Sequence, residues 1–361
     1  MNLGVSIIVG FKNRDLQRIK HSLDSILQQS NLSFEVIFID YGSDEVISTD
    51  VKRLVNSYPF AQYIYAHTNG WFWNRSHALN IGFKHAKNDI ILFYDIDLIL
   101  EPNFVEKILL LDYSSRFYTF SCFYLPVKFE INPFNLKNSA IHLEQNYVGL
   151  CAVSKIAVNN IQAFDEYFFV WGVEDDDIYY RLVTSGIFHT QFNANQFNVF
   201  HQWHLIQAPQ KPTLWYLTML TYLYKKESMH TGQMNMGYCT RFSDRKLLHV
   251  DQTSVAINKI SLGVDGSLLY FNSFIQSFYQ MKSGEIVHIE YVKKDNDVVK
   301  LPWYVKYFSK KERSKEFINQ TVIKNDILSF FNYFVGINRH RIDDYNLKID
   351  YNSVSIFILA K

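Results

Sequence analysis

Two groups of acidic residues have the spacing that is most useful for chemistry. The first is a run of four consecutive carboxylates, Glu174 to Asp177. Like charges repel, so such a run requires an offset from a helix N-terminus, a cation or a polar ligand. Trp171 and Gly172 precede the run, and apolar residues at helical spacing follow it. We therefore expect the acids on the first turn of a helix, whose dipole explains one or two of them, Asp177 included.

The second group is Asp95 and Asp97, which directly follow the apolar stretch Ile90–Tyr94. Two carboxylates one residue apart, on a bend at the end of a strand, can face the same ligand. Their oxygens suit Mg²⁺ or Mn²⁺, and such ions usually bind together with substrate phosphates. A pair of solvated turn residues is the alternative interpretation, because this short pattern is common.

Alternating strands and helices are predicted to position these residues. Val5–Val9, Phe34–Ile39 and Ile90–Tyr94 have the pattern of buried strands, and helical patterns lie between them, one of them over residues 74–86. This alternation predicts an α/β fold in which helices cover both faces of a mostly parallel sheet. Ligands of such sheets bind beyond the carboxyl ends of the strands. Asp40 ends the second strand, so we expect it at the same edge as the acidic pair.

The order of several motifs resembles that of a known enzyme family. Residues 74–83 read NRSHALNIGF, and residues 95–98 read DIDL. Together they resemble the NR…LN-x-GF…D-x-D-L-I segment of the β-1,4-galactosyltransferases. They are also similar to the same region of family 2 glycosyltransferases of GT-A fold, which include bacterial chondroitin-type polymerases. Residues 35–43, EVIFIDYGS, resemble the nucleotide-binding start of family 2, although Tyr41 replaces the second Asp of the usual D-D-G-S.

Two further motifs extend the resemblance along the chain. Residues 171–177, WGVEDDD, resemble the acceptor-site motif W-G-W-G-G-E-D-D-D of galactosyltransferases, without its extra Gly-Trp insertion. Residues 200–202, FHQ, resemble an H-Q pair found downstream of that motif in the bacterial enzymes. The resemblance covers about residues 3–210 and nothing past about residue 243. For the matching part it implies a GT-A (Rossmann-like) fold.

The resemblance also implies roles on the donor side of a reaction. Asp97 would ligate a divalent metal, and Asp95 would contact the ribose or a metal-bound water. His201 would be a further ligand, because a neutral imidazole suits Mn²⁺ better than Mg²⁺. His204 is a rival for that position, and either histidine could instead be a packed or surface side chain. Asp40 would accept the imide N–H of uracil, since a carboxylate only accepts hydrogen bonds.

The acceptor side follows from the same resemblance. An inverting transfer needs one general base to remove the proton of the acceptor hydroxyl, and the resemblance implies Asp175 for this role. Glu174 and Asp176 would hold sugar hydroxyls, and Trp171 would flank the sugar. Arg75 would pair with the diphosphate or position the first carboxylate of the D-x-D pair. A solvated cation at a helix start is the alternative for this arginine.

The bulk composition excludes other classes. A formal net charge of +1 over 361 residues gives no electrostatic reason to expect nucleic-acid binding. Cys122, Cys151 and Cys239 lie far apart, which indicates a reducing compartment. No apolar run is long enough to span a bilayer, and the N-terminal one is too short for a signal peptide. We expect a cytoplasmic protein, in which the basic and aromatic residues 303–315 could contact anionic lipid at the inner face of the membrane.

The pattern of the sequence changes near residue 240. We predict a GT-A domain over residues 1–242, with a nucleotide-sugar part at about 1–100 and an acceptor part at about 140–210. Residues 243–361 are predicted to form a small α+β appendage of unknown role. Strand-like stretches dominate there, at residues 268–271, 286–289 and 354–359, and one long helical pattern interrupts them.

The leading hypothesis is a metal-dependent, inverting glycosyltransferase. It would move galactose, N-acetylgalactosamine or N-acetylglucosamine from a UDP-sugar to a hydroxyl of a glycan or lipid-linked oligosaccharide, forming a β-linkage. Bacterial surface polysaccharide synthesis is the setting that the resemblance implies. The alternatives are a nucleotidyltransferase acting on sugar phosphates and a non-catalytic glycan-binding protein. A nucleotidyltransferase would be expected to have a Gly-rich basic loop after the first strand, and this sequence lacks one. A non-catalytic glycan-binding protein would not need the acidic residues and His201, which are intact here.

Overall fold

The computed structural model of the chain divides into two compact units. The first contains residues 1–69, 73–210 and 219–244, and the second contains 70–72, 211–218 and 245–361. The structure describes residues 4–126, 144–145, 149–169, 173–204, 239–249, 257–262, 275, 277–292, 327–328, 330–350 and 353–361. The predicted boundary after residue 242 lies close to the division at 244, whereas the membership of residues 70–72 in the second unit was not predicted.

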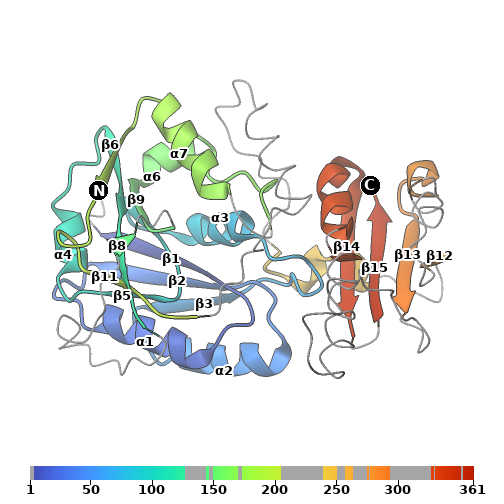
Figure 1. Cartoon of the computed structure of the whole chain (residues 1–361), viewed down its shortest axis with the longest axis horizontal. Coiled ribbons are helices and arrows are strands. Elements are labelled where there is room, and N and C mark those ends of the chain that lie inside the picture. The colour runs from blue at the N-terminus through green and yellow to red at the C-terminus, as the bar shows by residue number, and fades with distance from the viewer. Residues whose placement is uncertain are drawn as a thin grey trace, which may run out of the picture. The chain divides into compact units, whose positions relative to one another are not determined.

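The first unit is built on a seven-stranded sheet, in the order β10-β6-β9-β4-β1-β2-β3 (Figure 1). The strands are β1 (Val5–Phe11), β2 (Phe34–Asp40), β3 (Ala61–Tyr65), β4 (Ile90–Tyr94), β6 (Arg116–Phe120), β9 (Cys151–Ser154) and β10 (Phe188–Phe192). β1 pairs in parallel with β2 and β4, and β2 pairs in parallel with β3. β9 is antiparallel to both of its neighbours. The predicted mostly parallel sheet is confirmed.

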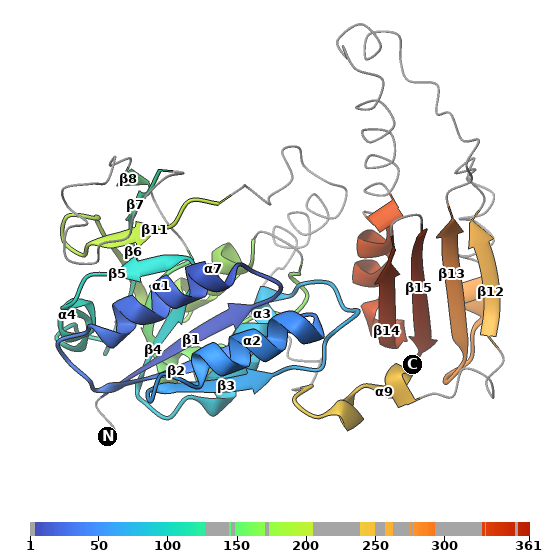
Figure 2. The same cartoon turned by 90° about the horizontal axis from the view of Figure 1, so that it is seen from below.

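Helices cover both faces of this sheet, as predicted. They are α1 (Leu16–Leu27), α2 (Glu45–Val55), α3 (Arg75–His85), α4 (Phe104–Leu109), α6 (Lys155–Asn160) and α7 (Glu174–Thr184). Figures 1 and 2 show α1 and α2 on one face and α3 on the other. α3 packs closely on the sheet at Gly82, where an added Cβ would overlap the Ile8 side chain. This close packing fixes the height of α3 above β1.

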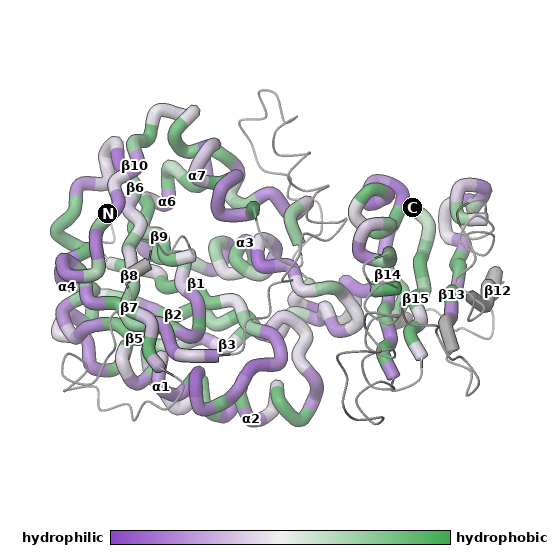
Figure 3. Tube along the Cα trace, viewed as in Figure 1, coloured by the Kyte–Doolittle hydropathy of each residue, from purple (hydrophilic) through white to green (hydrophobic). Residues whose placement is uncertain are grey.

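The core of the first unit forms where the strands are buried on both faces. β4 is buried at every residue, and β1 at every residue except Gly10. Figure 3 shows hydrophobic residues in the interior of the sheet, whereas α2 mixes hydrophobic and hydrophilic positions. Continuous apolar strands with amphipathic helices on top are the expected pattern for a parallel sheet. The rigid layer that results holds the strand ends in fixed positions.

A second, smaller sheet of the first unit has the order β5-β11-β7-β8. Its strands are β5 (Leu98–Leu100), β7 (Cys122–Tyr124), β8 (Glu144–Gln145) and β11 (Val199–His201). β11 is antiparallel to β5, so that His201 stands opposite Leu98. Because β5 begins one residue after Asp97, this register brings the His201 backbone beside the D-x-D segment.

The second unit contains a four-stranded sheet in the order β12-β13-β15-β14. The first unit ends with η1 (Phe242–Asp244). The elements of the second unit are α9 (Lys246–His249), β12 (Ile257–Leu262), β13 (Ile286–Val292), η2 (Arg339–Arg341), β14 (Ile342–Ile349) and β15 (Ser353–Ala360). Residues 330–337 are helical. Two predicted strands, at 286–289 and 354–359, fall within β13 and β15, and a third, at 268–271, lies outside the described residues. In the described part of the chain, every helix is too short or too polar to cross a bilayer.

Candidate active site

A possible metal site lies at the carboxyl end of β4. Asp97, His201 and His204 each offer one ligand atom, and these atoms lie within 4.8 Å of one another. His204 Nε2 is 3.2 Å from Asp97 Oδ2, and His201 Nε2 is 3.6 Å from Asp97 Oδ1. From the sequence, His201 and His204 were predicted as alternatives for one metal-ligating position. The structure places both beside the same carboxylate.

The chemistry of this group fits a divalent cation. Asp97 Oδ1 is buried, and it accepts no hydrogen bond from any described residue. Burial tends to raise the pKa of Asp97, but the His204 hydrogen bond and the nearby His201 outweigh burial and hold the pKa below its usual range. A buried oxygen that stays ionised and lacks a donor is suited to a metal. One carboxylate with two imidazoles favours Mn²⁺ over Mg²⁺ by the softness of nitrogen ligands.

Gln202 fixes the histidine-bearing segment to two other elements. Its backbone N–H donates to the Asp97 carbonyl at 2.8 Å. Its side-chain amide donates to the Arg18 carbonyl on α1 at 3.1 Å, and its Oε1 lies 3.1 Å from His21 Nδ1. The side chain is buried, so these contacts are shielded from water. The segment that carries both histidines is thereby tied to α1 and to the D-x-D turn.

Arg75 joins the two acidic groups that the sequence analysis treated separately. Its Nε donates to Asp95 Oδ1 at 3.0 Å, and its Nη1 donates to Asp175 Oδ1 at 2.8 Å. Its Nη2 donates to the Gly149 carbonyl at 2.9 Å. Asn74 caps α3 by accepting from the His77 N–H, which sets the start of the helix and the position of Arg75. The guanidinium is therefore the physical link between Asp95 and Asp175.

The acidic run occupies the first turn of α7, as predicted. The residue before it, Val173, has φ +63°, a left-handed conformation that is a genuine outlier for a β-branched side chain. Such strain costs about 1–3 kcal/mol and tends to cluster at functional sites.

Burial raises the pKa of Asp175 to about 8, against the lowering effect of the Arg75 charge. Burial also raises the pKa of Glu174. Both groups therefore hold a proton more tightly than ordinary carboxyls.

The other members of the run have different environments. Asp176 is exposed. Asp177 is buried and pairs with Arg181 one helical turn later, at 2.7 Å from Nη2 and 2.8 Å from Nε. Arg181 also donates to the Ile161 carbonyl, so this pair has the structural role expected for Asp177. Trp171, the predicted aromatic partner of the sugar, lies outside the described residues.

Asp40 lies at the end of β2 and is fully buried. Its Oδ1 accepts from the Ser43 N–H at 2.9 Å, and its Oδ2 accepts from the Tyr63 hydroxyl at 2.7 Å. Burial raises its pKa, and these hydrogen bonds oppose the rise. Each carboxylate oxygen has two lone pairs, so these hydrogen bonds do not use the full accepting capacity of the carboxylate. Uracil recognition by Asp40 stays a prediction.

One basic residue at this edge was missed by the sequence analysis. Arg14, just after β1, interacts electrostatically with Asp97 and Asp95, and burial lowers its pKa against their attraction. The signal was available, because residues 12–14 follow a buried parallel strand and ligands bind at that end. Arg14 adds a cation beside the possible metal site.

The chain matches the family model for glycosyl transferase family 2 over residues 6–167. The matched part of the chain contains Asp40, Arg75 and the D-x-D pair. The predicted resemblance to this family is confirmed, and the sheet and helices of the first unit confirm the predicted α/β fold class. α7 and both histidines lie beyond the matched residues.

Curated relatives include β-1,4-galactosyltransferases. The chain is 27% identical over 198 residues to β-1,4-galactosyltransferase 1 of Bos taurus, an alignment that covers 53% of this chain and 39% of the relative. It is 26% identical over 188 residues to β-1,4-galactosyltransferase 5 of Danio rerio, covering 50% and 39%. The chain thus spans about two fifths of the length of the curated relatives that it matches.

Solved structures with a similar fold include two glycosyltransferases. A mannosyltransferase from Pyrobaculum calidifontis, in complex with GDP-mannose and Mn²⁺, has a TM-score of 0.42 and 15% identity, covering 56% of this chain and 57% of that chain. GalNAc-T7 with UDP, GalNAc and Mn²⁺ has a TM-score of 0.47 and 14% identity, covering 61% and 48%. These likenesses concern the fold.

Proposed function

We propose that this protein is a metal-dependent, inverting glycosyltransferase that moves a hexose from a UDP-sugar to a glycan hydroxyl. The observation that supports it most is the Arg75 bridge, which places a buried carboxyl of raised pKa next to the D-x-D turn. A transferase needs these two features together: charge stabilisation at the leaving diphosphate and a base at the attacking hydroxyl.

The donor side would use the group formed by Asp97, His201 and His204. A divalent ion held there would neutralise the negative charge that builds up on the leaving nucleoside diphosphate. Arg14 already interacts with Asp97 and Asp95, and it would add a permanent positive charge for the same phosphates. Asp40 would accept from the uracil imide, and Asp95 would contact the ribose.

The acceptor side would use the first turn of α7. Asp175 would take the proton of the acceptor hydroxyl while that oxygen attacks the anomeric carbon, which inverts the configuration and gives a β-linkage. A base with a pKa near the working pH can both be ionised and hold the transferred proton. Glu174 and Asp176 would bind sugar hydroxyls, and Trp171 would flank the sugar.

Galactose is the first donor to test, because the curated relatives are named β-1,4-galactosyltransferases. N-Acetylgalactosamine and N-acetylglucosamine are the next candidates. A cytoplasmic location, a lipid-linked acceptor, membrane contact through residues 303–315 and a role in bacterial surface polysaccharide stay predictions. Residues 303–315 lie outside the described residues.

A donor screen tests the proposal directly. The protein is incubated with each UDP-sugar and a panel of glycan acceptors, with Mn²⁺ or with EDTA, and UDP release is measured. We expect release with at least one donor, dependent on acceptor and abolished by EDTA. Pyrophosphate release instead of UDP would indicate a nucleotidyltransferase, and glycan binding without UDP release would indicate a lectin-like protein.

Two variants separate the proposed roles. Asp97→Ala should abolish Mn²⁺-dependent UDP binding in calorimetry. Asp175→Asn should bind the donor normally but lose turnover by about 10²–10⁴-fold, the usual effect of removing a general base. Asp50→Asn, at an exposed acid on α2, serves as the control and should change neither quantity. Near-normal turnover of Asp175→Asn would show that another group is the base.

A further inference from the structure

Three residues between β3 and α3 belong to the second unit, although the chain on both sides of them belongs to the first. The segment is Gly70–Phe72. The second unit therefore includes a short segment of the chain that connects two elements of the first unit. The contacts of its central residue, Trp71, explain this membership.

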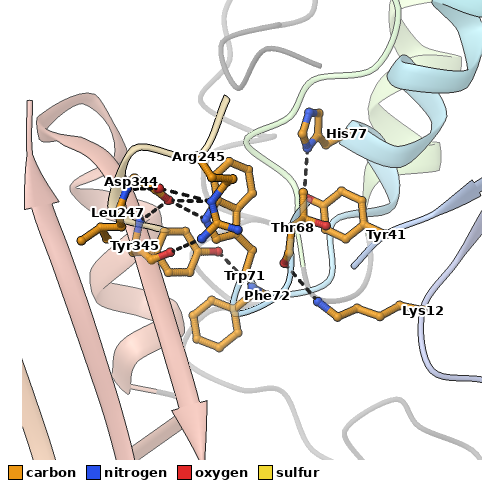
Figure 4. A network of polar contacts seen from close by, with 10 residues as sticks. All are labelled: Lys12, Tyr41, Thr68, Trp71, Phe72, His77, Arg245, Leu247, Asp344 and Tyr345. Atoms are coloured by element: carbon orange, nitrogen blue, oxygen red, sulfur yellow. Dashed lines mark hydrogen bonds and ion pairs between the residues drawn. The ribbon is translucent and has the colours of Figure 1, made fainter. Parts of the chain in front are cut away.

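Trp71 is held by two contacts with its ring and by a hydrogen bond from its ring nitrogen (Figure 4). The Arg245 guanidinium lies 4.7 Å from the ring centroid, and the Tyr345 ring stacks against it at 5.7 Å with an interplanar angle of 12°. The indole N–H donates to Asp344 Oδ1 at 2.8 Å. Only 8% of the Trp71 surface is exposed. An aromatic ring that contacts a cation and a second ring, and whose N–H is hydrogen-bonded, has one well-defined position.

The residues on either side of Trp71 are fixed through their backbones. The Gly70 carbonyl accepts from the Leu347 N–H of β14 at 2.8 Å. The Phe72 N–H donates to the Tyr345 hydroxyl at 3.0 Å. Gly70 has φ +80°, and an added Cβ would overlap the Asn346 side chain. Both the backbone conformation and the lack of space therefore disfavour any residue other than glycine there.

The partners of Trp71 are themselves held rigidly. Arg245 and Asp344 form an ion pair at 3.1 Å, and both side chains are almost completely buried. Asp344 also accepts from the Leu247 N–H, and Arg245 donates to the Tyr345 carbonyl. A fully paired buried network of this kind resists local movement. We call Trp71, Arg245, Asp344 and Tyr345 the tryptophan clamp.

The chain leads from the clamp directly into the candidate active site. Trp73 follows the clamped segment and packs edge-on against Tyr41 at 5.4 Å. Asn74 then caps α3 and donates to the Glu166 carbonyl at 2.9 Å. The next residue is Arg75, which bridges Asp95 and Asp175. Two residues therefore separate the clamped segment from the side chain that links both acidic groups.

We propose that the tryptophan clamp is a positioning element: it fixes the chain segment that runs directly into α3 and thereby the placement of Arg75. Trp71 is thus a positioning residue that acts through Arg75. The catalytic consequence rests on the proposed function, in which Arg75 adjusts Asp175. Reactions of this kind are sensitive to geometry, since a displacement of about 1 Å can cost about 10²-fold in rate.

Hydrogen exchange tests the structural half of the proposal without any assay of activity. The peptides that cover residues 74–80 are followed in the whole protein, because the His77 and Ala78 amides bond to the Asn74 cap. Trp71→Ala should speed their exchange at least tenfold. The control, Phe334→Ala, removes a buried ring of the second unit that packs on Phe278, away from the clamp. It should leave exchange of residues 74–80 within about twofold. Equal effects of the two variants, or no effect of Trp71→Ala, would overturn the proposal.

Milder variants keep the test decisive if Trp71→Ala does not fold. Trp71→Phe keeps a ring in the clamp but loses the indole donor, and Asp344→Asn keeps an acceptor but loses the charge opposite Arg245. Both should speed exchange of residues 74–80 by less than Trp71→Ala but more than Phe334→Ala. If residues 74–80 exchange at the wild-type rate in both variants, the proposal that the clamp fixes the start of α3 is refuted.

Activity then tests the catalytic half. With the donor found in the screen, Trp71→Ala should lower kcat by about 10-fold or more, and Trp71→Phe should recover most of it. Phe334→Ala should leave kcat within about twofold at a temperature where it is folded. If the wild type transfers no sugar, the proposed function fails while the exchange result still decides the clamp. If the wild type is active and Trp71→Ala keeps its kcat, the clamp does not position the active site.

Discussion

Replacing Arg75 by glutamine should move the pH dependence of turnover to higher pH. The pKa of Asp175 is about 8 because burial raises it, while the Arg75 charge at 2.8 Å lowers it. Removing that charge leaves burial unopposed, so the pKa must rise further. A general base works only when ionised, so turnover should rise with pH through the new pKa.

The size of the shift follows from the geometry. Two unit charges about 4 Å apart attract by about 4 kcal/mol at an effective dielectric constant of 20. At 1.36 kcal/mol per pKa unit, this attraction corresponds to about 3 units. Arg75 shares its charge with Asp95, and 17% of the Asp175 side chain is exposed, so we expect about 1–2 units. Turnover at pH 7 should then fall about 10–100-fold and recover towards the wild-type value as the pH rises.

The assay is UDP release between about pH 6 and pH 10, at saturating donor and Mn²⁺. Arg53→Gln, which removes an exposed arginine of α2 paired with Asp50, is the matched control and should reproduce the wild-type profile. A profile of Arg75→Gln that superimposes on the wild type would refute the idea that Arg75 tunes Asp175. A uniform loss of rate without a shift would assign Arg75 to donor binding instead.

Two further substitutions test how the site is supported. Asp177→Ala leaves the buried Arg181 charge unpaired, so it should lower the free energy of unfolding, measured by urea denaturation, by about 3–5 kcal/mol. The control Asp176→Ala, at an exposed acid, should change the free energy of unfolding by less than about 0.5 kcal/mol. Gln202→Ala releases the histidine segment from α1 and should weaken Mn²⁺ binding about 10–100-fold in calorimetry, whereas exposed Gln62→Ala should bind normally. An unchanged dissociation constant for Gln202→Ala would contradict the positioning role of this amide.

Much of the first unit could be predicted from local pattern. Apolar runs marked β1, β2 and β4, and the acids that end these strands lie where a parallel sheet places its ligands. The predicted helix began at Asn74, whereas α3 begins at Arg75 and Asn74 is its N-cap, so the predicted start was one residue too early. The acidic run lies on the first turn of α7, because the periodicity after it is helical.

Other features depend on packing between distant elements. The contact of Arg75 with Asp175 joins residues 100 positions apart, and no local period predicts it. The two histidines were predicted as rivals, because sequence spacing cannot tell whether both reach one carboxylate. The register of β11 against β5 and the buried Gln202 amide bring both to Asp97.

By itself, the sequence determined the fold class, the family and the residue types at the strand ends, since these follow from periodicity and from short contiguous motifs. Only the tertiary structure decided which charges meet. It joined the two acidic groups through one guanidinium, separated Asp177 from its neighbours by burying it with Arg181, and assigned Trp71 to the second unit through Asp344, 273 residues away. The physical reason is that burial and charge pairing depend on how strands and helices pack, and packing brings together side chains that local spacing cannot relate.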